Sequence, residues 1–245
     1  MKRLNIKKIL ISVGLLLVII GLSIGVYSSY FKTSSPKSNI NLDFKLEEED
    51  KNVNTDERRK VSCKEKLDNY RNQYNNSDIV AEMEILGTNI RSIVTQSGDN
   101  DFYLNHSLTK EYDAVGTVFM DYRVNINSRK ILLYGHNSQN IDTVFHRLEN
   151  YLNEDFYREH PDITLYTDED TVTYKIFSVM IVTNDYQYYL VDFTDSQWPI
   201  HLYNLKNSSI YDTGVALDKN DEVLILQTCF YNPMGSYLVI SAKKL

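Results

Sequence analysis

Eight short runs rich in aliphatic, aromatic and β-branched residues constrain the fold of this chain more than any other feature. In the first run Ala81, Met83 and Ile85 alternate with Glu82 and Glu84, which is the period-two pattern of a half-buried strand. The runs cover residues 79–87, 90–95, 116–121, 130–134, 163–166, 171–182, 222–228 and 236–242. They predict seven or eight strands.

Helical patterns are inserted among these strands and do not alternate with them. A first helix is predicted over 55–74, with Asn54 and Glu57 in capping-box spacing and Leu67 on its apolar face. A second is predicted over 141–160, ending before Pro161, and a third over 196–207. Strands dominate and no repeat is visible, so we expect a mainly β fold, an antiparallel and closed or nearly closed sheet with peripheral helices. A doubly wound α/β fold does not fit this order.

Residues 9–31 contain no charged side chain and are almost wholly apolar. At ~1.5 Å per residue, a helix of this length crosses a hydrocarbon core of ~30 Å. Lys2, Arg3, Lys7 and Lys8 precede the run without any acid, which favours a cytoplasmic N-terminus. The alternative is a cleaved signal peptide, although the run is longer than the usual apolar core of one.

The chain divides accordingly into four parts. We expect a cytoplasmic N-terminus (1–8), a transmembrane anchor (9–31), an extracellular spacer (32–54) and a folded catalytic domain (55–245). The spacer is rich in Ser, Asn and acidic residues and has no apolar period. The predicted location is the cell membrane, crossed once, with the folded domain outside.

Charge and cysteine content exclude several classes of protein. The net charge is −7, and removing the four basic residues before the anchor leaves −11, so nucleic acid is not an expected partner. Cys63 and Cys229 are the only cysteines, which excludes a disulfide-rich scaffold and leaves open one pair. No P-loop, dinucleotide-binding, zinc or calcium motif occurs, so we expect neither cofactor nor metal.

Nucleophilic catalysis is the chemistry that remains. Cys229 ends the predicted strand 222–228, and His136 follows the strand 130–134 after Gly135. Cysteine next to histidine is an arrangement in which the imidazole takes up the thiol proton and the sulfur attacks an acyl carbon. Taken singly, Cys229 also fits a small buried apolar residue, and His136 an ordinary loop histidine. His106 is an alternative candidate for the catalytic histidine in place of His136.

The other three histidines carry less weight. His146 and His160 fall on the polar side or the end of the predicted helix 141–160, and His201 falls in the predicted helix 196–207. We expect all three at the surface.

Several segments together resemble class B sortases. They are YLNHS (103–107), GTVFMDYR (116–123), LLYGHN (132–137), the TVFHRLENYL stretch that follows, and LQTC (226–229). The resemblance spans about 55–245, and the tether and spacer match as well. It implies an eight-stranded β-barrel with an N-terminal helical pair and a helix between strands six and seven.

The resemblance also implies an activity. Sortases cut a sorting signal of secreted surface proteins after its threonine, hold the fragment as a thioester, and pass it to an amine of the peptidoglycan precursor. The matching nucleophile is Cys229, with His136 as acid and base. The positions that match the peptide groove are Asn105, Tyr134, Tyr189, Leu190 and Thr228.

One departure from the family pattern concerns its third catalytic residue, an arginine on the last strand. No arginine follows Arg158 in this chain, and alignment puts Ser236, or Tyr237 one residue on, at the arginine position. Either residue has a hydroxyl group but no charge. Two alternatives to a membrane-anchored transpeptidase therefore stay open: a weakly active or inactive peptide-binding domain, and a secreted cysteine peptidase.

Overall fold

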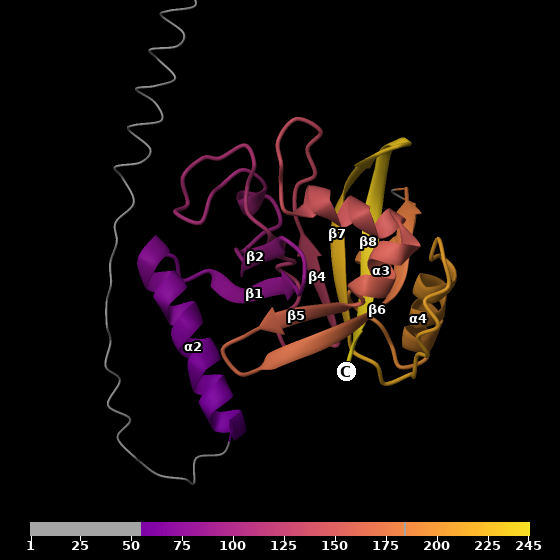
Figure 1. The fold of residues 1–245 in the computed structure, drawn as a ribbon, viewed down its shortest axis with the longest axis horizontal. Helices are drawn as coiled ribbons and strands as arrows, with labels where there is room; N and C mark the ends of the chain where they lie inside the picture. The colour runs from indigo at the N-terminus through magenta and orange to yellow at the C-terminus, as the bar shows by residue number, and fades with distance from the viewer. Residues whose placement is uncertain (1–54, 184) are drawn as a thin grey trace, which may run out of the picture. The chain divides into compact units, whose positions relative to one another are not determined.

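The computed structural model describes residues 55–183 and 185–245, and a closed barrel of eight strands dominates them. The strand order is β1-β2-β3-β4-β7-β8-β6-β5. Figure 1 shows the barrel, with every strand except β3 labelled. All neighbours are antiparallel except β2–β3 and β4–β7. The strands are β1 (Ile79–Ile85), β2 (Ile90–Thr95), β3 (Phe119–Met120), β4 (Lys130–Tyr134), β5 (Asp162–Tyr166), β6 (Thr171–Val182), β7 (Val223–Tyr231) and β8 (Met234–Lys244). The predicted mainly β barrel is confirmed.

Helices surround this barrel without entering it. The α-helices are α2 (Thr55–Tyr74), α3 (Glu154–Glu159) and α4 (Gln197–Asn207), and the 3₁₀ helices are η1 (Phe102–Leu104), η2 (Phe145–Leu152) and η3 (Gln187–Tyr189). The predicted bounds of α2 are confirmed, and α4 lies between β6 and β7, as the family resemblance implies. Of the implied N-terminal helical pair, the described residues contain α2.

Alternation along the strands produces two apolar clusters, one on each side of the sheet. In β7, Leu224 and Leu226 face the barrel interior, whereas Val223 and Ile225 pack outside against α4. The outer cluster includes the buried Trp198 of α4. Helix α4 therefore covers one part of the outer face of β6, β7 and β8, and does not cover the rest of that face.

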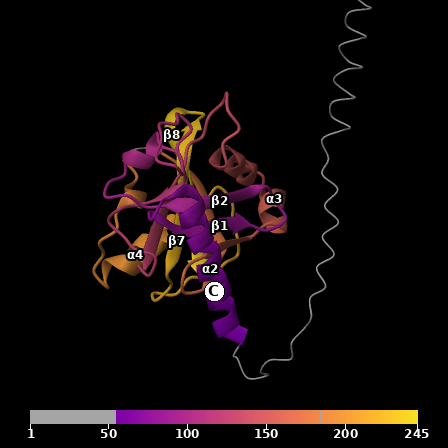
Figure 2. The ribbon, with the colours of Figure 1, turned by 90° about the vertical axis from the view of Figure 1, so that its left-hand side faces the viewer.

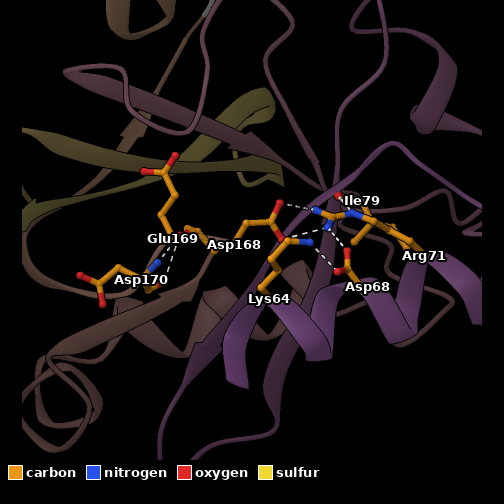
Figure 3. A network of polar contacts seen from close by, with 8 residues as sticks. Lys64, Asp68, Arg71, Ile79, Asp168, Glu169 and Asp170 are labelled. Atoms are coloured by element: carbon orange, nitrogen blue, oxygen red, sulfur yellow. Dashed lines mark hydrogen bonds and ion pairs between the residues drawn. The ribbon is translucent and has the colours of Figure 1, made fainter. Parts of the chain in front are cut away.

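Helix α2 lies along the side of the barrel next to β1 and the β5–β6 hairpin (Figures 1 and 2). Its main polar contact is Arg71, whose guanidinium binds Asp68 at 2.8 Å, Asp168 at 2.8 and 2.9 Å, and the carbonyl of Ile79 at 2.9 Å (Figure 3). Leu67 is fully buried beneath the helix. Cys63 is also buried, with its sulfur 3.1 Å from Thr171 Oγ1.

Three predicted elements differ from the structure. Of the strand expected over 116–121, only β3 (Phe119–Met120) forms. The helix expected over 141–160 is two shorter helices, η2 and α3, because Asn153 adopts an extended conformation and its side chain caps α3 by accepting from Asp155 N. Strand β7 continues through Cys229 to Tyr231, because its pairing with β8 extends to Tyr231, beyond the point where its pairing with β4 ends at Gln227. Cys229 therefore sits inside a strand.

The expected cytoplasmic segment, anchor, spacer and Asn54 cap lie outside the described residues. Within 55–183 and 185–245, no helix has both the length and the apolar character needed to cross a bilayer.

Candidate active site at the end of β4 and β7

Strands β4 and β7 run parallel and bring the two candidate catalytic residues to the same level. Tyr134 is paired with Gln227, and Gly135 N donates to Gln227 O at 3.2 Å, which extends the ladder beyond the end of β4. His136 and Cys229 each lie two residues further along their own segments. Two side chains 93 positions apart in sequence therefore sit on adjacent segments at one end of the barrel.

Two hydrogen bonds hold these segments together on either side of the pair. Thr228 Oγ1 donates to Gly135 O at 2.7 Å, and Asn137 Nδ2 donates to Cys229 O at 2.9 Å. The glycine is required here because a Cβ on Gly135 would lie 2.7 Å from the ring of Phe145. The residue before and the residue after His136 are thus both bonded to the strand that carries Cys229.

Asn137 is the centre of this connection and is almost fully buried. Its amide group also donates to Glu149 Oε1 at 2.5 Å, and its Oδ1 lies 2.7 Å from His146 Nδ1. Its carbonyl accepts a hydrogen bond from Tyr231 OH at 2.8 Å. With both atoms of its side-chain amide and its carbonyl engaged, Asn137 fixes the β4–η2 loop against β7.

The Cys229 thiol is free and its residue is exposed, as a nucleophile for a peptide must be. Partial burial of the sulfur raises the pKa of the thiol, so little thiolate forms without a base close by. His136 Nε2 lies 2.6 Å from Leu104 O, and His136 also lines a cavity of about 380 Å³ with Thr117 and Thr143. The imidazole is therefore accessible from the surface.

The β7–β8 register separates the two residues at the family's arginine position. Tyr237 is paired with Cys229, and Ser236 with the buried Phe230. Because directly opposed residues share a face, Tyr237 lies on the Cys229 face and Ser236 on the interior face. Ser236 is 2% exposed and its hydroxyl donates to Pro233 O at 2.6 Å.

Tyr134, a candidate groove residue, lies on the outer face of β4 and is linked to a second one, Tyr189. Tyr134 OH donates to Asp121 Oδ2 at 2.8 Å, Arg123 binds the same carboxylate, and Arg123 Nη2 donates to Tyr189 O at 3.0 Å. Burial alone would raise the pKa of Asp121, but the hydrogen bonds from Arg123 and Tyr134 outweigh it and hold the pKa below its usual value.

The remaining groove candidates differ in accessibility. Asn105 is exposed and follows Leu104, whose carbonyl contacts His136. Leu190 is half-buried, whereas Tyr189 is 40% exposed. Thr228 is fully buried with its hydroxyl bonded to Gly135, so its side chain does not face the surface.

The expectation that His201 lies at the surface is wrong. His201 is 8% exposed, because the face of α4 that carries it packs on the barrel, and its Nε2 lies 2.9 Å from Lys130 Nζ. His146 and His160 are half-buried. The rival His106 stacks on Phe102, with its Nδ1 2.7 Å from Phe102 O.

Three residues near the site were missed by the sequence interpretation. Asn137 stands in the YGHN segment, directly after His136, and this adjacency was its only signal. Tyr188 packs its ring 6.2 Å from that of Tyr237 and has no distinguishing pattern. Lys130 opens an otherwise buried strand, and a lysine in such a position signals specific polar partners.

The model of the sortase domain family matches residues 83–244, which is more than half of the chain and includes every strand from β2 onward. The chain belongs to the sortase family, and its relatives assign it to class B. Sortase B of Listeria monocytogenes is 32% identical over 158 residues, covering 63% of this chain and 63% of that protein. Sortase B of Staphylococcus aureus is 31% identical over 174 residues, covering 69% of this chain and 70% of that protein.

Solved structures agree with this assignment. The crystal structure of Clostridium perfringens sortase B superposes with a TM-score of 0.68 at 32% identity, covering 73% of this chain and 98% of that one. The chain therefore spans a little under two thirds of the Listeria relative but nearly all of the crystallised Clostridium domain.

Proposed function

We propose that this protein is a membrane-anchored cysteine transpeptidase that cleaves a C-terminal sorting signal after threonine and transfers the protein to an amine of the cell wall. Membership of the sortase family supports the reaction class. The observation that carries the proposal is that exposed Cys229 on β7 and His136, directly beyond β4, lie at the same level on adjacent segments that are hydrogen-bonded to each other.

The chemistry follows from the state of the thiol. Because its pKa is raised, Cys229 rests as a neutral thiol and passes its proton to His136 as the sulfur attacks the threonine carbonyl. The imidazolium then protonates the leaving amine, and the acyl group remains on sulfur as a thioester. The cell-wall amine attacks this thioester and gives a proton to His136, and the imidazolium then protonates the sulfur of Cys229 as it leaves, which restores the neutral thiol.

Tyr237 takes the place of the missing arginine in this proposal. It shares a face with Cys229, and its hydroxyl is a neutral donor for the oxyanion that forms during attack. Ser236 is the weaker choice, because its side chain is buried on the interior face and its hydroxyl is already bonded.

The peptide groove in this proposal runs over the outer face beside Cys229. Tyr189 and Leu190 form one wall, Tyr134 the floor, and Asn105 the opposite rim. Thr228 acts indirectly, by holding Gly135 next to His136. The anchor at 9–31 keeps this groove outside the cell membrane, where secreted proteins and peptidoglycan precursors meet.

The test uses the purified full chain with a threonine-containing sorting peptide and an amine acceptor. Wild-type protein is expected to form a thioester detectable by mass spectrometry and to yield the transpeptidation product, and Cys229→Ala is expected to form neither. Turnover retained by Cys229→Ala would contradict the proposal that Cys229 is the nucleophile of a transpeptidase. Peptide binding without any thioester would indicate the inactive domain instead, which the missing arginine motivates.

Two further arms complete the test. A product that is always the free acid, with or without added amine, would indicate a peptidase. Recovery of the full chain in the membrane fraction tests the anchor, and a deletion of 9–31 that leaves this distribution unchanged would contradict it.

A further inference from the structure

Three consecutive backbone carbonyls next to the site each accept a hydrogen bond from a cationic side chain. Lys130 Nζ donates to Tyr188 O and, at 2.6 Å, to Leu190 O. Arg123 Nη2 donates to Tyr189 O at 3.0 Å. Carbonyls of a surface loop ordinarily bond to water, so this segment is held in place from the β3–β4 side of the barrel.

The side chain of Lys130 is held in this position by burial and by its contacts. It is 2% exposed, and its third contact is His201 Nε2 at 2.9 Å. Burial lowers the pKa of Lys130 to about 7, with Arg123 adding to the effect and Asp121 opposing it. A charged amine donates to all three partners, whereas a neutral one donates to the two carbonyls and accepts from His201. Both forms therefore keep the segment in place.

Arg123 connects the same segment to the strand below. Its Nε donates to Asp121 Oδ1 at 2.9 Å and its Nη2 to Asp121 Oδ2 at 2.6 Å. Asp121 is fully buried and accepts from Tyr134 OH. The guanidinium thus joins Tyr134 on β4 to the carbonyl of Tyr189.

The held segment borders the proposed nucleophile. The Tyr188 ring is 5% exposed and packs 6.2 Å from that of Tyr237, which is paired with Cys229. Tyr189 remains 40% exposed beside it. Because the carbonyls of 188–190 are already bonded, they offer a peptide N–H no free acceptor of equal strength, and what the segment presents to a ligand is its side chains.

We propose that Lys130 and Arg123 are positioning residues that hold segment 188–190 as a rigid wall of the peptide groove, so that Tyr189 and Leu190 keep a fixed position against the bound peptide. This inference rests on the proposed function and names the two cationic residues that hold the wall in place. Neither residue touches the reacting atoms.

The experiment compares Lys130→Met and Arg123→Gln with wild type in the full chain. Arg129→Gln is the matched control, because Arg129 is a neighbouring arginine whose side chain binds Lys219 O and Asp195 and stacks on Trp198, and none of these partners belongs to 188–190. Hydrogen–deuterium exchange is measured over peptides that cover 186–193. Both test variants are expected to exchange at least about tenfold faster there, and the control at the wild-type rate.

Steady-state kinetics give a second readout. The KM for the sorting peptide is expected to rise about tenfold in each test variant, the equivalent of one hydrogen bond to a charged group, with kcat within about twofold of wild type. Arg123→Lys, which keeps a cation, is expected to recover part of the loss.

Unchanged exchange over 186–193 in Arg123→Gln overturns the inference, and so does a fall in kcat with no change in KM. If Lys130→Met does not fold, Arg123→Gln alone decides. If wild-type protein cleaves no peptide, the proposed function fails by itself, and the exchange data still decide whether the two cations hold the segment.

Discussion

Tyr237 lies directly opposite Cys229 in the β7–β8 ladder, whereas Ser236 lies opposite Phe230. Opposed residues in an antiparallel pair point to the same face, so a one-residue step along β8 moves a side chain from the interior of the barrel to the face that carries the thiol. The two positions that sequence alignment left open therefore differ completely in environment.

Arginine substitutions test this difference in environment directly. Ser236→Arg would bury an unpaired charge inside the barrel and is expected to lower the free energy of unfolding by at least about 3 kcal/mol. Tyr237→Arg keeps the charge on the outer face and is expected to cost less than about 1.5 kcal/mol. Urea unfolding of both variants provides the comparison, and equal losses would contradict the assignment of the two faces.

The hydroxyl of Tyr237 is expected to matter for rate. Removal of one donor to the oxyanion typically lowers the rate about 10²–10³-fold. For Tyr237→Phe we expect thioester formation to slow by at least about tenfold, because backbone N–H groups can compensate for part of the loss. Tyr203→Phe is the control, since Tyr203 is 68% exposed on α4. Single-turnover measurements separate acylation from transfer, and a wild-type acylation rate would remove Tyr237 from the mechanism.

Asn137 is expected to affect both stability and rate. Asn137→Ala leaves Cys229 O, Glu149 and His146 without their shared partner, and we expect a loss of about 2–3 kcal/mol in unfolding free energy. Acylation should slow as well, because the loop that carries His136 is no longer bonded to β7. Asn140→Ala, at an exposed position of the same loop, is the control. Thermal unfolding and single-turnover kinetics of the two variants should diverge.

His201 predicts a specific pH dependence of stability. Burial, with Lys130 next to it, lowers the pKa of His201 from 6.5 to about 3. Between these values the unfolded chain binds the extra proton, so stability falls as the pH drops below 6.5, by up to about 1.4 kcal/mol per unit, and does not depend on this group above it. His201→Gln keeps an acceptor for Lys130 and removes the titration.

The measurement for His201 is the difference in unfolding free energy between wild type and His201→Gln. From pH 7.5 to pH 5 this difference is expected to shift against wild type by about 2 kcal/mol, while the carboxylates common to both proteins cancel. A constant difference over this range would show that His201 is not buried in its neutral form.

Arg71 is expected to contribute more than other surface arginines. It binds two carboxylates and a carbonyl, so Arg71→Ala should lower the unfolding free energy by about 1–2 kcal/mol. Arg158 makes a single exposed pair with Glu154, and Arg158→Ala should change stability by less than about 0.5 kcal/mol. Unfolding of the two variants in parallel decides whether α2 is fastened to the barrel through Arg71.

The elements that depend on local pattern were predictable. Apolar runs located every strand, although only residues 119–120 of the run 116–121 form β3, and the bounds of α2 were predicted correctly, because side-chain period and turn residues act within a few positions. The helix over 141–160 failed at Asn153, where a single side chain caps a new helix and ends the apolar period. The prediction that His201 lies at the surface failed because the amphipathic pattern of α4 does not reveal which side of the helix the barrel will cover.

The composition of the candidate site was predictable in part. Cys229 and His136 were identified by their positions at predicted strand ends and by a family resemblance. Asn137, Lys130 and Arg123 were not, because their partners are backbone carbonyls and carboxylates on distant segments. Every residue has a backbone carbonyl, so the sequence does not indicate which carbonyl will accept a hydrogen bond from a distant side chain.

The sequence by itself determined that the chain forms a β-rich domain that carries a thiol and an imidazole in or directly after its strands, since these properties follow from short-range periodicity and from side-chain chemistry. Only the tertiary structure decided that β4 and β7 are parallel neighbours, which brings Cys229 level with His136. It also decided, through the β7–β8 register, that Tyr237 rather than Ser236 shares their face. Strand pairing is a long-range choice among many segments with similar patterns, and it is made by the packing of the whole barrel.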